Sequence, residues 1–255
     1  MTNIYDIYTT NHINEASILN IDDTISEGDG IDTVIDFVRH MLSNGVEVFG
    51  KKIDEKYAEE LGAYLWKGNI MTFNKGEIII DSEAYGKYAD ETFTDDNKRN
   101  LSTLAFGLLF SSNGLCINPK KMPKSIKEIT YKYVKENEEF AIKLVGDNNF
   151  SNVDIQCDSR LSIFAENPSN IKLGKLNCNE LQVYGYKNDT LLTGLSLKPG
   201  SVINILDLSS RTCAKISKLV GKNLTIYKLK LNSSIVGNIL TDMGFATQNT
   251  YVELT

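Results

Sequence analysis

The segment Cys178-Asn179-Glu180-Leu181-Gln182-Val183 carries the apolar spacing that decides the fold of this chain. Four other segments repeat the spacing, with apolar positions at Phe150-Val153-Ile155, Leu192-Leu195-Leu197, Ile203-Leu206-Leu208 and Ile226-Leu229-Leu231. Apolar residues two positions apart lie on one face of a β-strand, because successive side chains point to opposite sides. The repeated segments therefore predict short strands that share one core and present a surface, which favours binding over catalysis.

The pattern resembles leucine-rich repeats over about 80 residues, and Asn177 and Cys178 before Leu181 resemble variants found on bacterial surface proteins. That resemblance implies a solenoid with a nearly constant period of roughly 20 to 29 residues. The central apolar positions are instead separated by 8, 20, 14, 11 and 23 residues, at Val153, Leu161, Leu181, Leu195, Leu206 and Leu229. The uneven intervals do not predict membership of the family. A β-sandwich or irregular sheet is therefore the first expectation, and a β-solenoid or leucine-rich-repeat-like stack is the alternative.

The rest of residues 125 to 255 is also predominantly β in character. Alternating apolar residues over 129–133 and 140–144, on both sides of a polar link, predict a β-hairpin. Further strands are expected near residues 154, 162, 173, 182, 196, 206, 217 and 229. Residues 235–243 predict a late helix and residues 251–254 a last strand.

The first half of the chain has helical periodicity instead. Helices are predicted through the apolar positions of residues 31–42, 53–65 and 101–109, each bounded by capping residues or a terminal glycine. Residues 70–73 and 77–80 flank Asn-Lys-Gly and predict a hairpin. A short strand is possible over residues 46–49, and residues 1–25 are read as an extended arm or a first strand.

The two halves differ in charge and are joined by a proline-containing segment. Pro119 and Pro123 mark the boundary between an acidic, helix-rich α+β domain (1–118) and a basic, β-rich domain (125–255), so the fold class is α+β. Residues 1 to 115 hold 9 Lys or Arg and 20 Asp or Glu, whereas residues 116 to 255 hold 18 and 13. Such asymmetry indicates charge-driven association and says little about the fold itself.

No catalytic, cofactor-binding or metal-binding residue is predicted. His12 and His40 are the two histidines, and His40, near a helix end, is expected to be structural. The four cysteines lack metal-site spacing and are expected to be small buried hydrophobic residues, at 116, 157, 178 and 213. Acidic residues gather before two of the predicted helices, where they favour helix starts over calcium binding, at 22, 23, 27, 29, 32 and at 90, 91, 95, 96. Hydrolase, zincin, P-loop and dinucleotide motifs do not occur.

The basic half carries lysines interspersed with Tyr184, Tyr186 and Tyr227, namely Lys172, Lys175, Lys215, Lys218, Lys222, Lys228 and Lys230. Nucleic-acid binding is the weaker expectation, because Arg is rare and the acidic half would repel phosphates. A solvated lysine face that discourages strand aggregation is the simpler interpretation. The longest apolar run, residues 104–110, is far shorter than the roughly 20 residues of a membrane span.

These observations predict a non-enzymatic structural or protein-interaction protein, such as a phage or mobile-element assembly component. Contact between the acidic half of one copy and the basic half of the next is one version of this hypothesis. Neutralisation of the two halves within one monomer is equally open. The alternatives are an inhibitor or adaptor that binds one host protein through its β-rich face and, less favoured, an enzyme of unfamiliar type. The N-terminus lacks a secretory signal, so a cytoplasmic or virion-associated location is expected.

Overall fold

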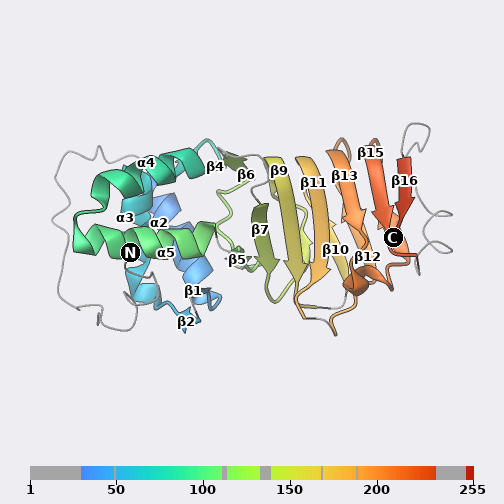
Figure 1. The fold of residues 1–255 in the computed structure, drawn as a ribbon, viewed down its shortest axis with the longest axis horizontal. Coiled ribbons are helices and arrows are strands. Elements are labelled where there is room, and N and C mark those ends of the chain that lie inside the picture. The colour runs from blue at the N-terminus through green and yellow to red at the C-terminus, as the bar shows by residue number, and fades with distance from the viewer. Residues whose placement is uncertain are drawn as a thin grey trace.

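The computed structural model describes residues 30–48, 50–110, 114–132, 139–167, 169–187, 189–233 and 251–255. Helices gather at one end of the molecule, and β-strands stack away from them along its long axis (Figure 1). The predicted α+β class, with a helix-rich first half and a mostly β second half, is confirmed. The predicted N-terminal arm and the late helix over 235–243 lie outside the described residues.

Four α-helices form the helical end, and three of them were predicted from apolar periodicity. Their bounds are α2 (Gly30–Ser43), α3 (Ala58–Lys67), α4 (Ser82–Thr92) and α5 (Asp96–Leu109), with a 3-10 turn η1 (Glu55–Tyr57) before α3. Helix α4 was missed because Thr92 is its one fully buried residue, so its apolar stripe is weak. Its start is capped by Asp81, whose carboxylate accepts the Ala84 N–H at 3.0 Å.

A long, ten-stranded sheet runs from the helical end to the C-terminus (Figure 1). It begins with the predicted antiparallel hairpin of β3 (Met71–Asn74) and β4 (Glu77–Asp81), and every other pairing in it is parallel. The other strands are β5 (Leu115–Ile117), β6 (Glu128–Lys132), β7 (Glu139–Leu144), β9 (Asp154–Ala165), β11 (Leu176–Gly185), β13 (Val202–Leu208), β15 (Thr225–Leu231) and β16 (Tyr251–Leu254). Because β4 pairs with β6, the sheet passes through both predicted domains, and one core cluster of buried residues extends across them.

A second, short sheet has four parallel strands and lies behind the long one (Figure 1). Its strands are β8 (Asn149–Phe150), β10 (Asn170–Leu173), β12 (Gly194–Leu197) and β14 (Lys218–Val220), and the 3-10 turn η2 (Arg211–Cys213) precedes β14. The small pair β1 (Glu47–Val48) and β2 (Lys51–Lys52) lies in the helical half, where β1 occupies part of the strand predicted over 46–49.

The chain alternates between the two sheets, and each round trip forms one coil of a β-solenoid-like stack. The pairs β8–β9, β10–β11, β12–β13 and β14–β15 each place one strand in the short sheet and the next in the long sheet. This is the stacked alternative of the sequence analysis; the sandwich, with its antiparallel sheets, does not form. Parallel pairing buries the inner side of each strand within the stack.

The uneven intervals in the sequence arose because Val153 of a turn and Leu195 of the short sheet were counted together with positions of the long sheet. In the long sheet, aligned positions follow one another at 20, 25, 23 and 23 residues, and they are Leu161, Leu181, Leu206, Leu229 and Val252. In the short sheet the intervals are 23, 24 and 24, at Asn149, Lys172, Ser196 and Val220. Sorted by sheet, the pattern has the period of a solenoid.

The predicted hairpin between residues 129 and 144 is wrong. Strand β6 pairs with the first part of β9, and β7 pairs with the second part, both in parallel. Alternation of apolar residues identifies a strand but does not specify its partner or direction. The last predicted strand, residues 251–254, is confirmed as β16.

Candidate interaction surface

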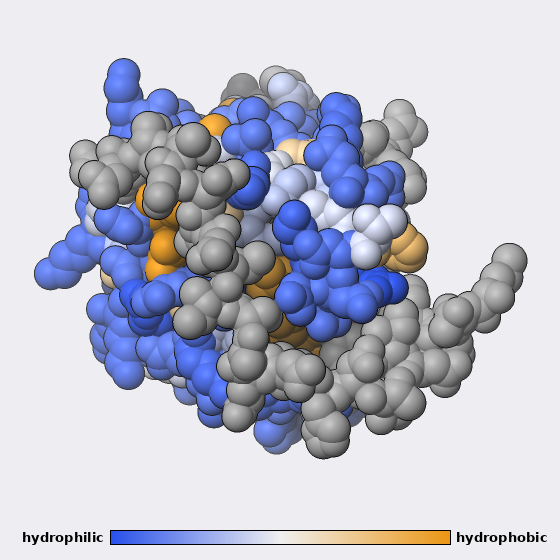
Figure 2. Space-filling view, turned by 90° about the vertical axis from the view of Figure 1, so that its left-hand side faces the viewer, coloured by the Kyte–Doolittle hydropathy of each residue, from blue (hydrophilic) through white to orange (hydrophobic). Residues whose placement is uncertain are grey.

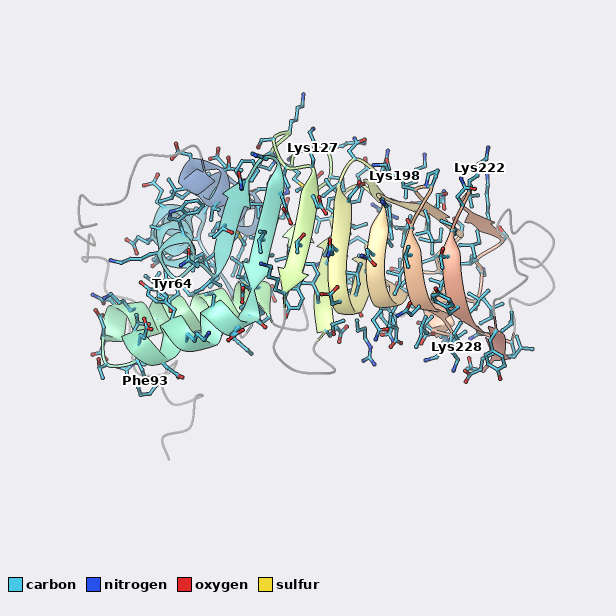
Figure 3. All side chains as sticks on the ribbon, turned by 90° about the horizontal axis from the view of Figure 1, so that it is seen from above. Tyr64, Phe93, Lys127, Lys198, Lys222 and Lys228 are labelled. Atoms are coloured by element: carbon cyan, nitrogen blue, oxygen red, sulfur yellow. The ribbon has the colours of Figure 1, made fainter. Side chains whose placement is uncertain are left out.

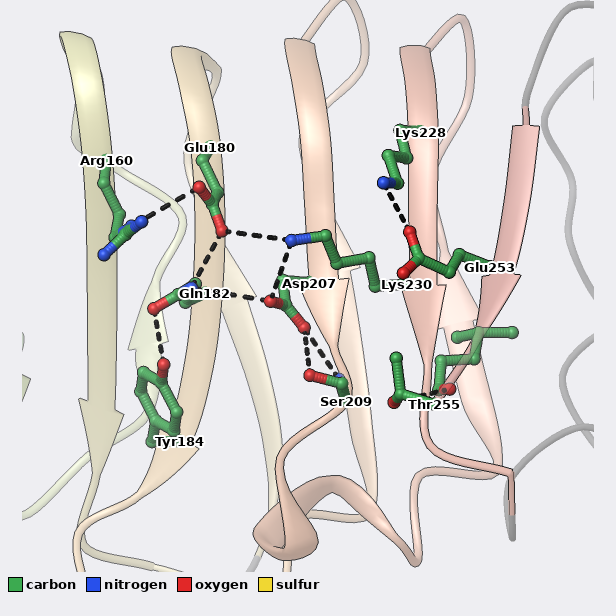
Figure 4. A network of polar contacts seen from close by, with 11 residues as sticks. Arg160, Glu180, Gln182, Tyr184, Asp207, Ser209, Lys228, Lys230, Glu253 and Thr255 are labelled. Carbon is green, nitrogen blue, oxygen red and sulfur yellow. Dashed lines mark hydrogen bonds and ion pairs between the residues drawn. The ribbon is translucent and has the colours of Figure 1, made fainter. Parts of the chain in front are cut away.

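The outer face of the long sheet carries a ladder of opposite charges (Figure 4). Glu180 lies 3.3 Å from Arg160 on one neighbouring strand and accepts a hydrogen bond from Gln182 at 2.8 Å. The Lys230 ammonium lies between Asp207 (3.6 Å) and Glu180 (3.8 Å). Cross-strand pairs of opposite charge stabilise a sheet, so this face neutralises its own charges.

The same ladder continues toward both ends of the long sheet. Lys228 pairs with Glu253 on β16, and Lys143 on β7 lies 3.3 Å from Glu166 and 3.5 Å from the centre of the Tyr186 ring. Burial, reinforced by nearby carboxylates, raises the pKa of Tyr184 to about 12, so its hydroxyl stays protonated and donates to Gln182. We call this outer face, with its paired charges, the neutralised face.

The short sheet and the turns that lead from it to the long sheet carry a different set of charges. Nine lysines lie on these elements and on the 119–127 segment, which we together call the lysine surface: Lys120, Lys121, Lys124, Lys127, Lys172, Lys175, Lys198, Lys218 and Lys222. All nine are exposed. Two are paired, Lys120 with Asp147 at 3.1 Å and Lys198 with Asp154 at 2.7 Å. The other seven form no ion pair with any residue of the described ranges.

The lysines of the turns repeat with the coil. Lys175, Lys198 and Lys222 follow the last strand residue of β10, β12 and β14 in three successive coils. Neighbouring coils are separated by about 4.8 Å, the spacing of paired strands. Lys127, Lys198 and Lys222 lie along one long edge of the molecule, as Figure 3 shows. The result is a line of lysines that crosses several coils, in which Lys198 is paired with Asp154.

A recess of about 480 Å³ opens at the end of the lysine surface nearest the helices. Its charged lining consists of Lys120, which pairs with Asp147 in the same lining, and of the unpaired Lys124 and Lys127, beside the amides of Asn149 and Asn152. Its apolar lining comes from Pro119, Met122, Pro123, Ile126 and Val153. The recess therefore combines positive charge with an apolar floor.

His40 holds one wall of this recess from helix α2. Its Nε2 accepts the backbone N–H of Asn118 at 3.1 Å and lies 3.2 Å from the Asn44 amide nitrogen. Burial, assisted by the positive charge of Lys121, lowers the pKa of His40 to about 4. The imidazole is thus neutral near pH 7 and acts as a hydrogen-bond acceptor that fixes the chain before Pro119. This is the structural role predicted for it; His12 lies outside the described residues.

The remaining candidate residues give no second site. All four cysteines are free and buried, as predicted. Burial raises the pKa of each thiol, to about 12 for Cys157 and Cys213, which disfavours the thiolate needed for metal binding or nucleophilic attack. Within the described ranges no group of His, Cys, Asp and Glu side chains has the geometry of a metal site. Asp95 caps helix α5, as expected of the second acidic cluster; most of the first cluster lies outside the described residues.

The sequence predicted some lysines of the lysine surface but not that they lie together on one surface. Lys172, Lys175, Lys218 and Lys222 were noted as residues on separate strands, whereas Lys228 and Lys230 belong to the neutralised face. The prediction missed Lys120, Lys121, Lys124, Lys127 and Lys198. The available signal was the lysine that follows the apolar end of each short-sheet strand, at residues 175, 198 and 222, with intervals of 23 and 24.

Comparisons of the chain with protein-family models, with curated proteins and with solved structures gave no match. The helices of the described ranges are too short or too polar to cross a bilayer.

Proposed function

We propose that this chain is a non-enzymatic interaction protein whose lysine surface binds an acidic surface of a protein partner. One observation carries the proposal: seven exposed lysines without a carboxylate partner lie together on the lysine surface, while the lysines of the neutralised face are paired. Like charges about 5 Å apart repel one another, so an anionic partner relieves repulsion as it binds. An assembly role in a cytoplasmic or virion-associated particle belongs to the same proposal.

The chemistry of the surface favours a protein partner over nucleic acid. Its cations are all lysines, which lack the planar fork with which arginine grips phosphate in a bidentate manner. The exposed tyrosines that could stack on bases, Tyr186, Tyr227 and Tyr251, lie on or directly after strands of the long sheet. Single-stranded nucleic acids are bound largely through such stacking. Carboxylates of an acidic protein need only point charges at the right spacing.

A charge-reversal experiment tests this proposal. The triple variant Lys175→Glu, Lys198→Glu, Lys222→Glu reverses the line of charge, and Lys67→Glu, Lys132→Glu, Lys187→Glu changes the net charge equally at exposed sites elsewhere. Binding of fluorescent polyglutamate at low salt should weaken roughly tenfold or more in the first variant and little in the second. A duplex DNA of similar charge serves as the second probe.

Two outcomes would overturn the proposal. One is equal loss of polyglutamate binding in both triple variants, which would reduce the effect to net charge. The other is binding of the DNA probe without binding of polyglutamate, which would assign the surface to nucleic acid. Circular dichroism of all variants verifies that the stack remains folded.

A further inference from the structure

The recess on the lysine surface has the properties of an anchor pocket. Interfaces concentrate their binding free energy in a few apolar or aromatic side chains that fill such pockets. The floor residues Met122, Ile126 and Val153 are at most 7% exposed, so they are fixed within the core. The Asn118 carbonyl accepts the Lys121 and Met122 N–H groups at 3.0 and 3.1 Å, which keeps the lysine-bearing wall in place. The matching ligand is an apolar side chain flanked by carboxylates.

The helical end of the same chain presents such a group. Phe93 lies between α4 and α5 with 63% of its surface exposed, and four carboxylates surround it in the sequence, at Asp90, Glu91, Asp95 and Asp96. We call these five residues the Phe93 corner. Seen end-on, the described part of this end is mainly hydrophilic with small apolar areas (Figure 2). Aromatic residues, phenylalanine included, are enriched in protein–protein interfaces relative to the rest of the surface.

The Phe93 corner is held rigidly and keeps part of its negative charge free. The Asp95 carboxylate accepts the N–H groups of Asn97 and Lys98 at 3.0 and 3.2 Å, which fixes the start of α5 directly after Phe93. Asp95 and Asp96 form ion pairs with Lys98 and Arg99, and the Arg99 guanidinium lies 5.6 Å from the centre of the Phe93 ring. Asp90 and Glu91 form no ion pair with another described residue. An exposed ring beside free carboxylates complements the recess.

We infer that the Phe93 corner of one copy docks into the lysine-lined recess of a second copy. This inference rests on the proposed function, since it names a second copy of the chain as an acidic partner. Figure 3 places Phe93 at the helical end and Lys127 on the opposite long side, so the two sites do not meet within one monomer. The ion pairs of Arg39, Lys87, Lys120 and Lys198 also join residues of the same half of the chain. The two sites are therefore available to different copies.

Docking of two different patches makes a heterologous contact. A pair of copies then leaves one recess and one corner free, so the contact repeats into a ring or an open filament. Association should be strongest at low ionic strength, because the charges at both sites are exposed and salt screens them within about 10 Å.

Sedimentation velocity over a concentration series tests the inference. Wild type should grow beyond a dimer at low salt and dissociate in 0.5 M salt (on the order of a 5 Å screening length). Phe93→Ala should raise the dissociation constant about tenfold or more, while Phe106→Ala, which truncates another exposed phenylalanine of the helical end, should not. Lys124→Glu with Lys127→Glu should abolish growth in the same way.

A mixture of the two defective variants gives the decisive result. Phe93→Ala keeps a working recess and the Lys124→Glu, Lys127→Glu variant keeps a working corner, so together they should form a 1:1 dimer and nothing larger. Larger oligomers in the mixture, no dimer in it, or a wild type that stays monomeric at low salt would each overturn the inference. If wild type is monomeric yet polyglutamate binding still depends on Lys175, Lys198 and Lys222, self-assembly fails while the proposed function stands.

Discussion

On the neutralised face, Glu180 lies between Arg160 and Lys230 from strands on either side, whereas on the short sheet Lys172 and Lys218 face solvent without a carboxylate partner. Both faces belong to the same coils and rest on the same buried rows. The difference shows that the solenoid constrains its inner positions and leaves the outer positions free. One outer face uses that freedom for cross-strand pairs, and the other keeps a charge that only a partner can neutralise.

Truncation of a buried residue that supports both faces should have the largest effect on stability. Leu206 is fully buried between Leu181 and Leu229, so Leu206→Ala should lower the free energy of unfolding by about 2 to 5 kcal/mol. The adjacent Ile205 is only partly buried, and Ile205→Ala is the matched control with an expected loss of about 1 kcal/mol or less. Urea unfolding measures both. Equal losses would show that the inner row is not the common core of the two faces.

Acidification should lower the free energy of unfolding through protonation of His40, which lies beside the lysine surface. The pKa of His40 is lowered from 6.5 to about 4, so the unfolded chain binds a proton before the folded one does. The free energy of unfolding should therefore be highest above pH 6.5, where His40 is neutral in both states. It should fall by up to about 3 kcal/mol as the pH drops toward 4. In His40→Gln, the free energy of unfolding should fall less over this range. An unchanged pH profile would contradict the assigned role of the imidazole.

Removal of one charge from the ladder of the neutralised face should lower the stability of the fold. Glu180 is 9% exposed, and Glu180→Gln removes the negative charge between Arg160 and Lys230. We expect a loss of about 1 to 3 kcal/mol, since the two cations then lack one partner. Thermal unfolding at one salt concentration measures it, and Gln182→Ala, which removes the hydrogen bonds of Gln182 with Glu180, Asp207 and Tyr184, shows the effect of losing polar contacts without losing a charge. No loss in Glu180→Gln would mean that the ladder does not stabilise the sheet.

Charge removal on the lysine surface should have the smallest effect and the opposite sign. Lys175→Gln with Lys222→Gln relieves repulsion between coils, so stability at low salt should rise by about 0.5 kcal/mol or less. The gain should disappear in high salt, where screening already suppresses the repulsion. Guanidinium is itself a salt, so urea is the denaturant of choice. A salt-independent loss of stability would indicate that these lysines hold the fold together.

Local patterns in the sequence were sufficient to predict the elements whose hydrogen-bonding partners are close in the sequence. Three helices were predicted by apolar periodicity with their caps, and the β3–β4 hairpin was predicted by the Asn-Lys-Gly turn between its strands. Lys75 and Gly76 of that turn both have positive φ, the conformation that such a turn requires. Helix α4 escaped prediction because it packs through partly buried tyrosines, Tyr85 and Tyr88, which do not form a strong apolar stripe.

The sequence by itself determined which residues face inward, how charge divides between the two halves, and that the second half consists of short strands. Only the tertiary structure decided which strands are neighbours, because aligned residues such as Leu181 and Leu206 are 25 positions apart and alternation is the same in parallel and antiparallel sheets. That long-range pairing sorted the strands into two sheets and revealed their common period. It also brought the lysines of separate turns into one surface and set Asn118 against His40, which no local pattern encodes.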